Sequence, residues 1–257
     1  MKKITTRDLV QTALFIALAL VVRQISIMIP FGGSSGMRIG VSEVFTKMPA
    51  LLFGPVLGGL ASGLVDILAQ VIKSEGAYLW LMLPVMILGG VITGVCWKFF
   101  KNISSKKLRR GFFIACSLFG LAGIVNSVIV VFNIEGAYLS ALSSLNTKIV
   151  FLTYGLIAIA VFGFLFMAVD FLVRKKAGDN YNDDFMQLAL TVFTSDVIVT
   201  TLNTIVLRLP VPFGVGLSKL PFLVFYIPRL IPDFVATFLF AYLLSCMLKI
   251  YNRVIKK

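Results

Sequence analysis

Long apolar runs separated by short polar segments dominate this sequence of 257 residues. Most of them are ~17–25 residues long, which is the length a helix needs to cross the hydrocarbon core of a bilayer. Hydrophobic residues make up 59% of the chain, too many for a water-soluble globule of this size. The pattern predicts an all-α, polytopic transmembrane bundle of about eight helices. They are expected near residues 9–29, 41–54, 56–72, 79–97, 111–132, 149–173, 185–207 and 222–248.

The run at 41–54 is shorter than the others and ends at Phe53-Gly54-Pro55. Proline has no backbone N–H and glycine is flexible, so this tripeptide favours a tight reversal of the chain. Such a break is tolerated at membrane depth only where protein surrounds it. We therefore expect a short helix that stops inside the protein.

Basic residues supply the orientation, because Lys and Arg concentrate on the cytoplasmic side of membrane proteins. Sixteen of the 24 basic residues fall in four clusters with an even number of predicted spans between them. Both termini are therefore predicted to be cytoplasmic, in a multi-pass protein of a cell membrane that we expect to be prokaryotic. The clusters are Lys2, Lys3, Arg7; Lys98, Lys101, Lys106, Lys107, Arg109, Arg110; Arg174, Lys175, Lys176; and Lys249, Arg253, Lys256, Lys257.

Several function classes are disfavoured by what the chain lacks. There is no histidine, which is the commonest general base and metal ligand, and no GxxxxGK[ST] loop to hold ATP phosphates. We expect no cofactor, no metal and no enzymatic activity, and any ATP hydrolysis must come from another subunit. The net charge of +13 reflects topology and contact with the lipid bilayer. Nucleic-acid binding is not expected, because no soluble module with a basic face and aromatic platforms is present.

The stretch at 37–78 carries charge inside apolar sequence, at Arg38, Glu43, Lys47 and Asp66. Ionisable groups are costly in hydrocarbon and commonly mark a functional site, so a ligand cavity is predicted here. The alternative is local: Glu43 and Lys47 are four residues apart on one helical face and could simply neutralise each other.

Basic residues outside the four clusters are all predicted to lie near the outer half of the bilayer. A cavity opening there would be electropositive and would favour an anionic ligand, because Arg can hold a carboxylate with two parallel hydrogen bonds. The best candidates for ligand contact lie closest to apolar runs, and the rest could sit at lipid headgroups. The candidates are Arg23, Arg38 and Arg229, with Glu43 and Lys47 shaping selectivity, and Arg208 is also included; Lys73, Lys148 and Lys219 are assigned to headgroups.

Two aromatic residues, Tyr78 and Trp80, are candidate ligand contacts near the outer boundary, where anchoring in the interface explains them equally well. Tyr78 belongs to a segment, residues 75–79, that recurs sixty positions later at 135–139 as Glu-Gly-Ala-Tyr-Leu. Extending the alignment pairs Asp66 with Asn126. Either a helix pair was duplicated, or two similar turns coincide.

A set of short motifs resembles the substrate-binding S component of energy-coupling factor (ECF) vitamin transporters, closest to the folate-type branch. They are Arg23-Gln24-Ile25-Ser26-Ile27, Arg38-Ile39-Gly40, Gly54-Pro55, a glycine-rich stretch ending at Asp66, and Pro228-Arg229-Leu230-Ile231. The resemblance implies a single membrane domain, 1–257, with a six-helix core at 8–100 and 185–250. Residues 111–173 would then be an inserted helix pair. Glu43 and Lys47 depart from the largely apolar second helix of folate-type members, which leaves the substrate open.

The resemblance also implies a mechanism and partners. An S component binds a vitamin or related micronutrient, here expected to be anionic with a folate-like compound as one candidate, and delivers it through a transmembrane coupling subunit driven by two ABC ATPases. Docking would use small residues on the first helix, where Ala13 and Ala17 lie four apart and permit close helix approach. The main alternative is a stand-alone ion-coupled transporter of a small organic anion, which an internal repeat would suit. A membrane-embedded enzyme or a scaffold is less favoured, because no pair of carboxylates is clustered.

Overall fold

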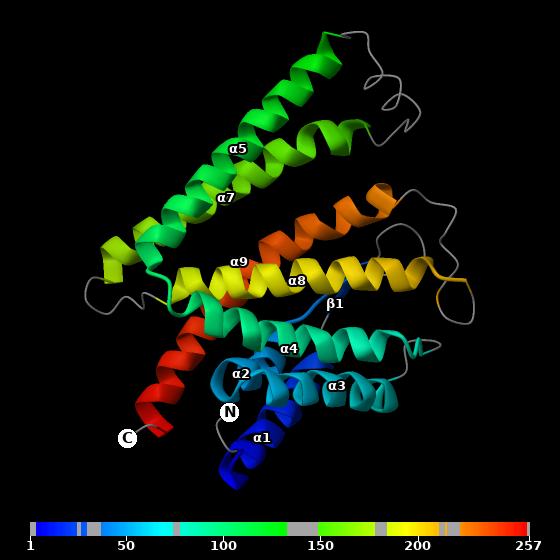
Figure 1. Ribbon diagram of the computed structural model, residues 1–257, viewed down its shortest axis with the longest axis vertical. Helices are drawn as coiled ribbons and strands as arrows, with labels where there is room; N and C mark the ends of the chain where they lie inside the picture. The colour runs from blue at the N-terminus through cyan, green and yellow to red at the C-terminus, as the bar shows by residue number, and fades with distance from the viewer. Residues whose placement is uncertain are drawn as a thin grey trace. The chain divides into compact units, whose positions relative to one another are not determined.

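The computed structural model describes residues 4–24, 27–29, 37–73, 78–132, 149–177, 184–210, 214 and 222–255. Contacts divide the chain into two compact units (Figure 1). Unit 1 combines Met1–Ile103 with Asp184–Lys257, and unit 2 is Ser104–Asp183. Each unit is described by itself. Whether the whole chain behaves as one domain stays a prediction.

Unit 1 contains six described helices, and their positions follow the apolar runs of the sequence. A two-stranded antiparallel hairpin, in which Ile27 pairs with Ile39, lies between the first two helices. The helices are α1 (Thr6–Arg23), α2 (Ser42–Phe53), α3 (Pro55–Ile72), α4 (Met82–Phe100), α8 (Phe185–Arg208) and α9 (Phe222–Ile255), and the strands are β1 (Ile27–Ile29) and β2 (Met37–Ile39).

Local sequence explains where two of these helices begin and end. Before α1, the Thr5 hydroxyl accepts from the Asp8 N–H at 3.3 Å and the Asp8 carboxylate accepts from the Thr5 N–H at 3.1 Å, a capping box. Helix α2 ends at Phe53, and Gly54 adopts a φ of 102°, which favours glycine. Pro55 is then the first residue of α3, where its missing N–H costs nothing. The predicted reversal at Phe53-Gly54-Pro55 is confirmed.

Glycines allow α2, α3 and α4 to pack closely. A Cβ built on Gly58 would overlap Ala50 of α2 and the Gly90 carbonyl of α4. A Cβ on Gly90 would in turn overlap the Gly58 carbonyl, and one on Gly94 would lie 2.6 Å from the backbone of Pro55. Backbone therefore approaches backbone at these sites, as in membrane helices that associate through small residues.

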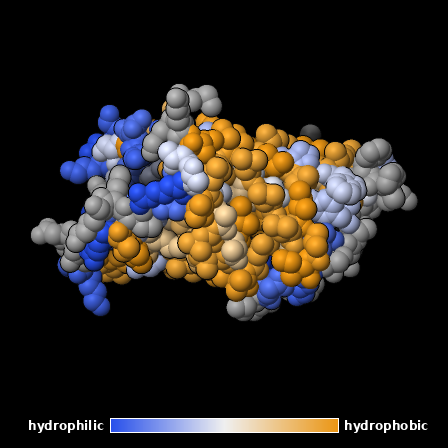
Figure 2. Space-filling model, turned by 90° about the horizontal axis from the view of Figure 1, so that it is seen from below, coloured by the Kyte–Doolittle hydropathy of each residue, from blue (hydrophilic) through white to orange (hydrophobic). Residues whose placement is uncertain are grey.

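Six of the eight described helices are long and apolar enough to cross a membrane. These segments are Pro55–Ile72, Met82–Phe100, Ser105–Ile129, Gly155–Lys176, Phe185–Arg208 and Asp233–Val254. Helix α2 has only 12 residues, and α1 carries Arg7, Asp8 and Arg23. The all-helical membrane architecture is thus confirmed, with six such segments where about eight spans were expected. Figure 2 shows a broad hydrophobic band on one face with hydrophilic residues gathered toward both ends, as expected of a surface in contact with lipid.

Unit 2 is a helix pair formed by α5 (Ser105–Val131) and α7 (Ile149–Ala177). Its helices are held by an ion pair between Arg109 Nε and Asp170 Oδ2 at 3.0 Å and by an edge-on contact of the Phe112 and Phe166 rings. A Cβ on Gly123 would meet Ile157 at 2.7 Å, so this pair is closely packed as well. The second copy of the repeated segment, 135–139, lies outside the described residues.

Candidate functional site

A cavity of about 300 Å³ lies within unit 1, lined by residues from all six of its helices. Among the described lining residues, charged groups, hydroxyls and glycines predominate, and no side chain is aromatic. The charged residues are Arg23, Glu43, Lys47, Asp66, Asp196, Arg229 and Asp233. A polar cavity of this size in an otherwise apolar bundle is where a ligand is expected.

The centre of the charged group is Lys47 on α2, whose side chain is 10% exposed. Its ammonium lies 2.6 Å from Asp196 Oδ1 on α8 and 3.1 Å from Glu43 Oε2 one helical turn earlier. A buried ammonium needs such partners, because a lone charge removed from water is costly. The local ion pair between Glu43 and Lys47 is therefore present, but Lys47 also forms an ion pair with Asp196 on α8.

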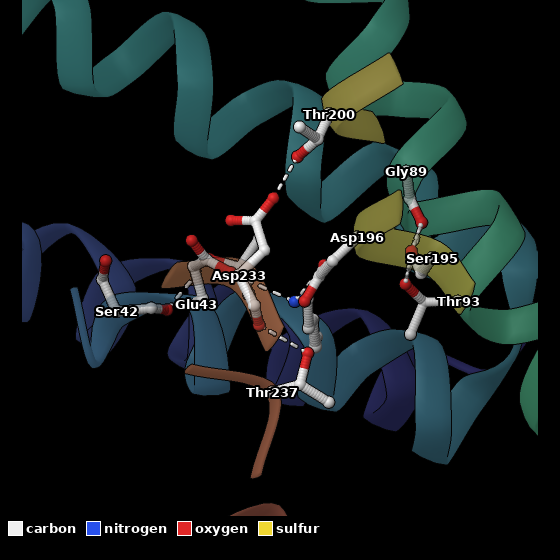
Figure 3. Close-up of polar contacts among 11 residues, drawn as sticks. Ser42, Glu43, Gly89, Thr93, Ser195, Asp196, Thr200, Asp233 and Thr237 are labelled. Carbon is white, nitrogen blue, oxygen red and sulfur yellow. Dashed lines mark hydrogen bonds and ion pairs between the residues drawn. The ribbon is translucent and has the colours of Figure 1, made fainter. Parts of the chain in front are cut away.

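Helix α9 adds a third carboxylate, Asp233, to this group. The Thr200 hydroxyl of α8 donates to Asp233 Oδ2, and Arg229 lies one turn earlier on α9 within electrostatic range. Asp233 is also within electrostatic range of Glu43 and Lys47. Figure 3 shows the side chains of Glu43, Asp196 and Asp233 gathered in one region from three different helices.

Hydroxyl groups surround another part of the cavity wall, where α4 meets α8. Thr93 donates to the Gly89 carbonyl at 2.8 Å, and the Ser195 hydroxyl lies 2.7 Å from that of Thr93 and 3.1 Å from the same carbonyl (Figure 3). Both hydroxyls are almost completely buried. A Cβ on Gly89 would lie 2.7 Å from the side chain of Val199, so a glycine is needed for this close approach.

A third polar group involves Asp66 on α3. Arg23 Nη2 at the end of α1 lies 3.9 Å from Asp66 Oδ1, and the Tyr78 hydroxyl donates to Asp66 Oδ2 at 2.8 Å. Partial burial, and then the hydrogen bond to this carboxylate, raise the pKa of Tyr78 and keep it a donor. The Trp80 ring packs edge-on against Tyr78, with centroids 5.2 Å apart.

The structure brings together five of the nine predicted substrate residues. Tyr78 contacts a lining residue without lining the cavity itself, and Trp80 is 76% exposed. Arg208 does not line the cavity, and its guanidinium lies over the Phe222 ring at 5.7 Å. The side chain of Arg38 lies outside the described part of the chain. The five that line the cavity are Arg23, Glu43, Lys47, Asp66 and Arg229.

The predicted set omitted every cavity-lining residue of α8. Its lining residues are Ser195, Asp196, Val199, Thr200 and Asn203. Spacings of one, three, one and three place them on one helical face. This stripe is visible in the sequence and could have identified the wall of the cavity. Asp233 could not have been assigned in the same way, because it is an isolated acid on α9.

Helix α1 buries Thr12, Phe15, Ile16 and Ala19 and exposes the opposite face. Both predicted docking residues, Ala13 and Ala17, lie on the exposed face. The large apolar side chains exposed on this helix are Leu9, Val10, Leu14, Leu18 and Val21. A partner helix could therefore reach Ala13 and Ala17 directly.

Comparison with known protein families gives one match, to the family of the S component of ECF-type riboflavin transporters, over residues 3–176. This span is more than half of the chain. The chain therefore belongs to this family. A search of curated proteins and of solved structures finds no match. The folate-type branch is not confirmed.

Membership in this S-component family places the chain among transporter subunits rather than enzymes. S components bind a vitamin and work with an ECF module, and with its long apolar helices this one is a multi-pass protein of the cell membrane. The matched residues include α5 and α7 and end before α8. They therefore contain four of the six helices that form the cavity.

Proposed function

We propose that this chain is the substrate-specificity subunit of an ECF transporter and captures a vitamin-sized molecule in the cavity of unit 1. The observation that carries the proposal is a cavity of about 300 Å³, lined by polar and charged residues from six helices, in a member of the S-component family. Ligand sites in proteins have volumes from about 300 to 1,000 Å³, so the cavity suits a small organic molecule.

The proposed partners are a transmembrane coupling subunit and two ABC ATPases, since S components work with an ECF module and this chain has no phosphate-binding loop. The exposed Ala13 and Ala17 of α1 support a docking face for the coupling subunit, because small residues let two helix backbones approach closely. As part of the same proposal, both termini lie in the cytoplasm, and a helix pair is inserted into a six-helix core. The compactness of Ser104–Asp183 as a unit of its own supports the inserted pair.

The chemistry of the substrate is less constrained than the class of the protein. The family is named for riboflavin, whereas the sequence suggested an anionic ligand with a folate-like compound as one candidate. Around the cavity, the described lining residues include three basic and four acidic side chains. Recognition would rest on hydrogen bonds and charge, because none of these residues is aromatic.

An uptake experiment tests the proposal. Membrane vesicles would contain either this chain alone or this chain with an ECF module, and small molecules copurifying with the protein would be identified by mass spectrometry. We expect a copurifying compound whose uptake requires both the module and ATP. Uptake by the chain alone that stops when a proton or sodium gradient is removed would instead establish an ion-coupled transporter.

A further inference from the structure

Carboxylates outnumber cations around the cavity. Its described lining carries four acids and three bases, a formal charge of −1. Each basic group already has an acid beside it: Lys47 has Asp196 and Glu43, Arg23 has Asp66, and Arg229 has Asp233 within electrostatic range. An anionic ligand would therefore have to displace an existing partner. A cationic ligand would instead offset the excess negative charge of the lining residues.

The surplus lies in the group formed by Glu43, Asp196 and Asp233, because these three acids share only two cations, Lys47 and Arg229. Lys47 makes its shorter contact with Asp196, at 2.6 Å, and its longer one with Glu43, at 3.1 Å. The Glu43 side chain remains 43% exposed while lining the cavity, and Asp233 is held by a neutral hydroxyl, that of Thr200. Glu43 and Asp233 lie within electrostatic range of each other, and Lys47 and Arg229 lie within range of Asp233, so the acids of this group exceed its cations by one charge.

An independent observation on α8 points the same way. The Oδ1 atom of Asn203 is buried and accepts no hydrogen bond from the described part of the chain, although Asn203 lines the cavity. A buried acceptor without a donor costs about 1–3 kcal/mol, so such atoms in native structures normally have a partner. The group that satisfies it must be a donor. Carboxylates and this amide oxygen together make a wall rich in acceptors.

On the basis of the proposed function, we propose that the ligand presents a positively charged, donor-rich nitrogen group, a protonated amine or amidine, to Glu43 and Asp233. Such a group supplies both the missing charge and N–H donors for the acceptors of the wall. A divalent metal ion fits less well, because no group of three His, Cys, Asp or Glu side chains in the described residues is arranged to hold one.

The test uses the full-length protein purified from cells, in three variants besides the wild type. Glu43→Gln and Asp233→Asn each remove one carboxylate from the cavity with almost no change in shape. Asp184→Asn is the matched control, because Asp184 precedes α8 and does not line the cavity. Small molecules are extracted and identified by mass spectrometry. Thermal unfolding is then followed with pyridoxamine, riboflavin and folate as cationic, neutral and anionic probes; pyridoxamine carries a protonated primary amine.

We expect the compound recovered from the wild type and from Asp184→Asn to carry a basic nitrogen that is protonated at neutral pH. Its recovery should fall about tenfold or more in Glu43→Gln and Asp233→Asn, as expected for a lost charge-assisted contact. Among the probes, the cation should stabilise the wild type most and the anion least.

Recovery of an anion, or of a neutral compound without a basic nitrogen, would overturn this inference and leave the proposed function intact. Equal recovery from all four proteins would also overturn it. If no compound is recovered and no probe stabilises the protein, the proposed function itself fails. The charge of the compound bound by the wild type decides the question even if a variant does not fold.

Discussion

Lys47 Nζ lies 2.6 Å from Asp196 Oδ1, so two residues 149 positions apart in the chain form a buried ion pair inside unit 1. The pair joins the short helix α2 to α8. Breaking a buried pair by removing one partner is strongly destabilising, because the remaining charge loses its compensation. Removing either partner alone is therefore expected to disturb the cavity wall.

Replacing Lys47 with methionine should destabilise the protein by about 3–5 kcal/mol, because it leaves Asp196 and Glu43 without their cation. Asp196→Asn should cost less, since Lys47 keeps its contact with Glu43. The double variant should recover part of the loss seen in Lys47→Met. Thermal unfolding of the purified proteins in one detergent measures all three, and equal losses in the two single variants would contradict the shared pairing.

The sequence predicted the helices well because hydrophobic run length directly determines which segments can span a bilayer. The run at 56–72 corresponds to α3 at Pro55–Ile72, and that at 185–207 corresponds to α8 at Phe185–Arg208. Helix α1 was expected over residues 9–29. It ends at Arg23, with Ile27–Ile29 in strand β1 instead, and it begins at Thr6 rather than at residue 9. The difference arises because a capping box, rather than hydrophobicity, determines where this helix starts.

The site was only partly predictable. Charge inside apolar sequence identified Glu43, Lys47 and Asp66, because such residues are costly unless they have a function. Sequence spacing also revealed the neighbour of Lys47 one turn away. Its stronger partner Asp196 depends on how α2 packs against distant helices, which no local pattern encodes. For the same reason the sequence could not exclude Arg208 from the site, although Arg229, one of the leading candidates, lines the cavity and Arg208 does not.

Gly90→Ala should disrupt the packing of α3 and α4, because the new methyl group would overlap the Gly58 carbonyl. A backbone atom cannot move aside as a flexible side chain can, so we expect a loss of about 1–3 kcal/mol or more. Gly111→Ala is the matched control, since a Cβ at that helical position meets nothing within 4 Å. Unfolding in detergent should show loss of stability in Gly90→Ala alone. Equal behaviour of the two variants would rule out close packing at Gly90.

Tyr78→Phe should lower the free energy of unfolding by about 1 kcal/mol, because the Asp66 carboxylate loses a hydrogen bond of 2.8 Å. The raised pKa of Tyr78 means that the fold favours the protonated phenol. This contribution is fully present below pH ~10 and is lost as the pH rises through the folded-state pKa. Unfolding at pH 7 measures the effect. Tyr242→Phe is the control, because Tyr242 is exposed and contacts the Phe185 ring, an interaction that phenylalanine retains. An equal change in both would exclude a specific role for the Tyr78 hydroxyl.

Replacing Ala13 and Ala17 together with leucine should impair assembly with the coupling subunit while leaving ligand binding intact. Both residues lie on the exposed face of α1 and line no part of the cavity, so the added bulk would hinder only a partner helix. The yield of complex copurified with a tagged coupling subunit should fall about tenfold, which corresponds to about 1.4 kcal/mol.

Ala122→Leu provides the matched control for this experiment, because it makes the same change at an exposed position of α5. Mass spectrometry of the copurifying compound reports ligand binding in every variant. Loss of assembly and binding together would mean that the leucines disturb the fold of unit 1. Normal assembly in the double variant would remove α1 as the docking face and leave another exposed surface to make the contact.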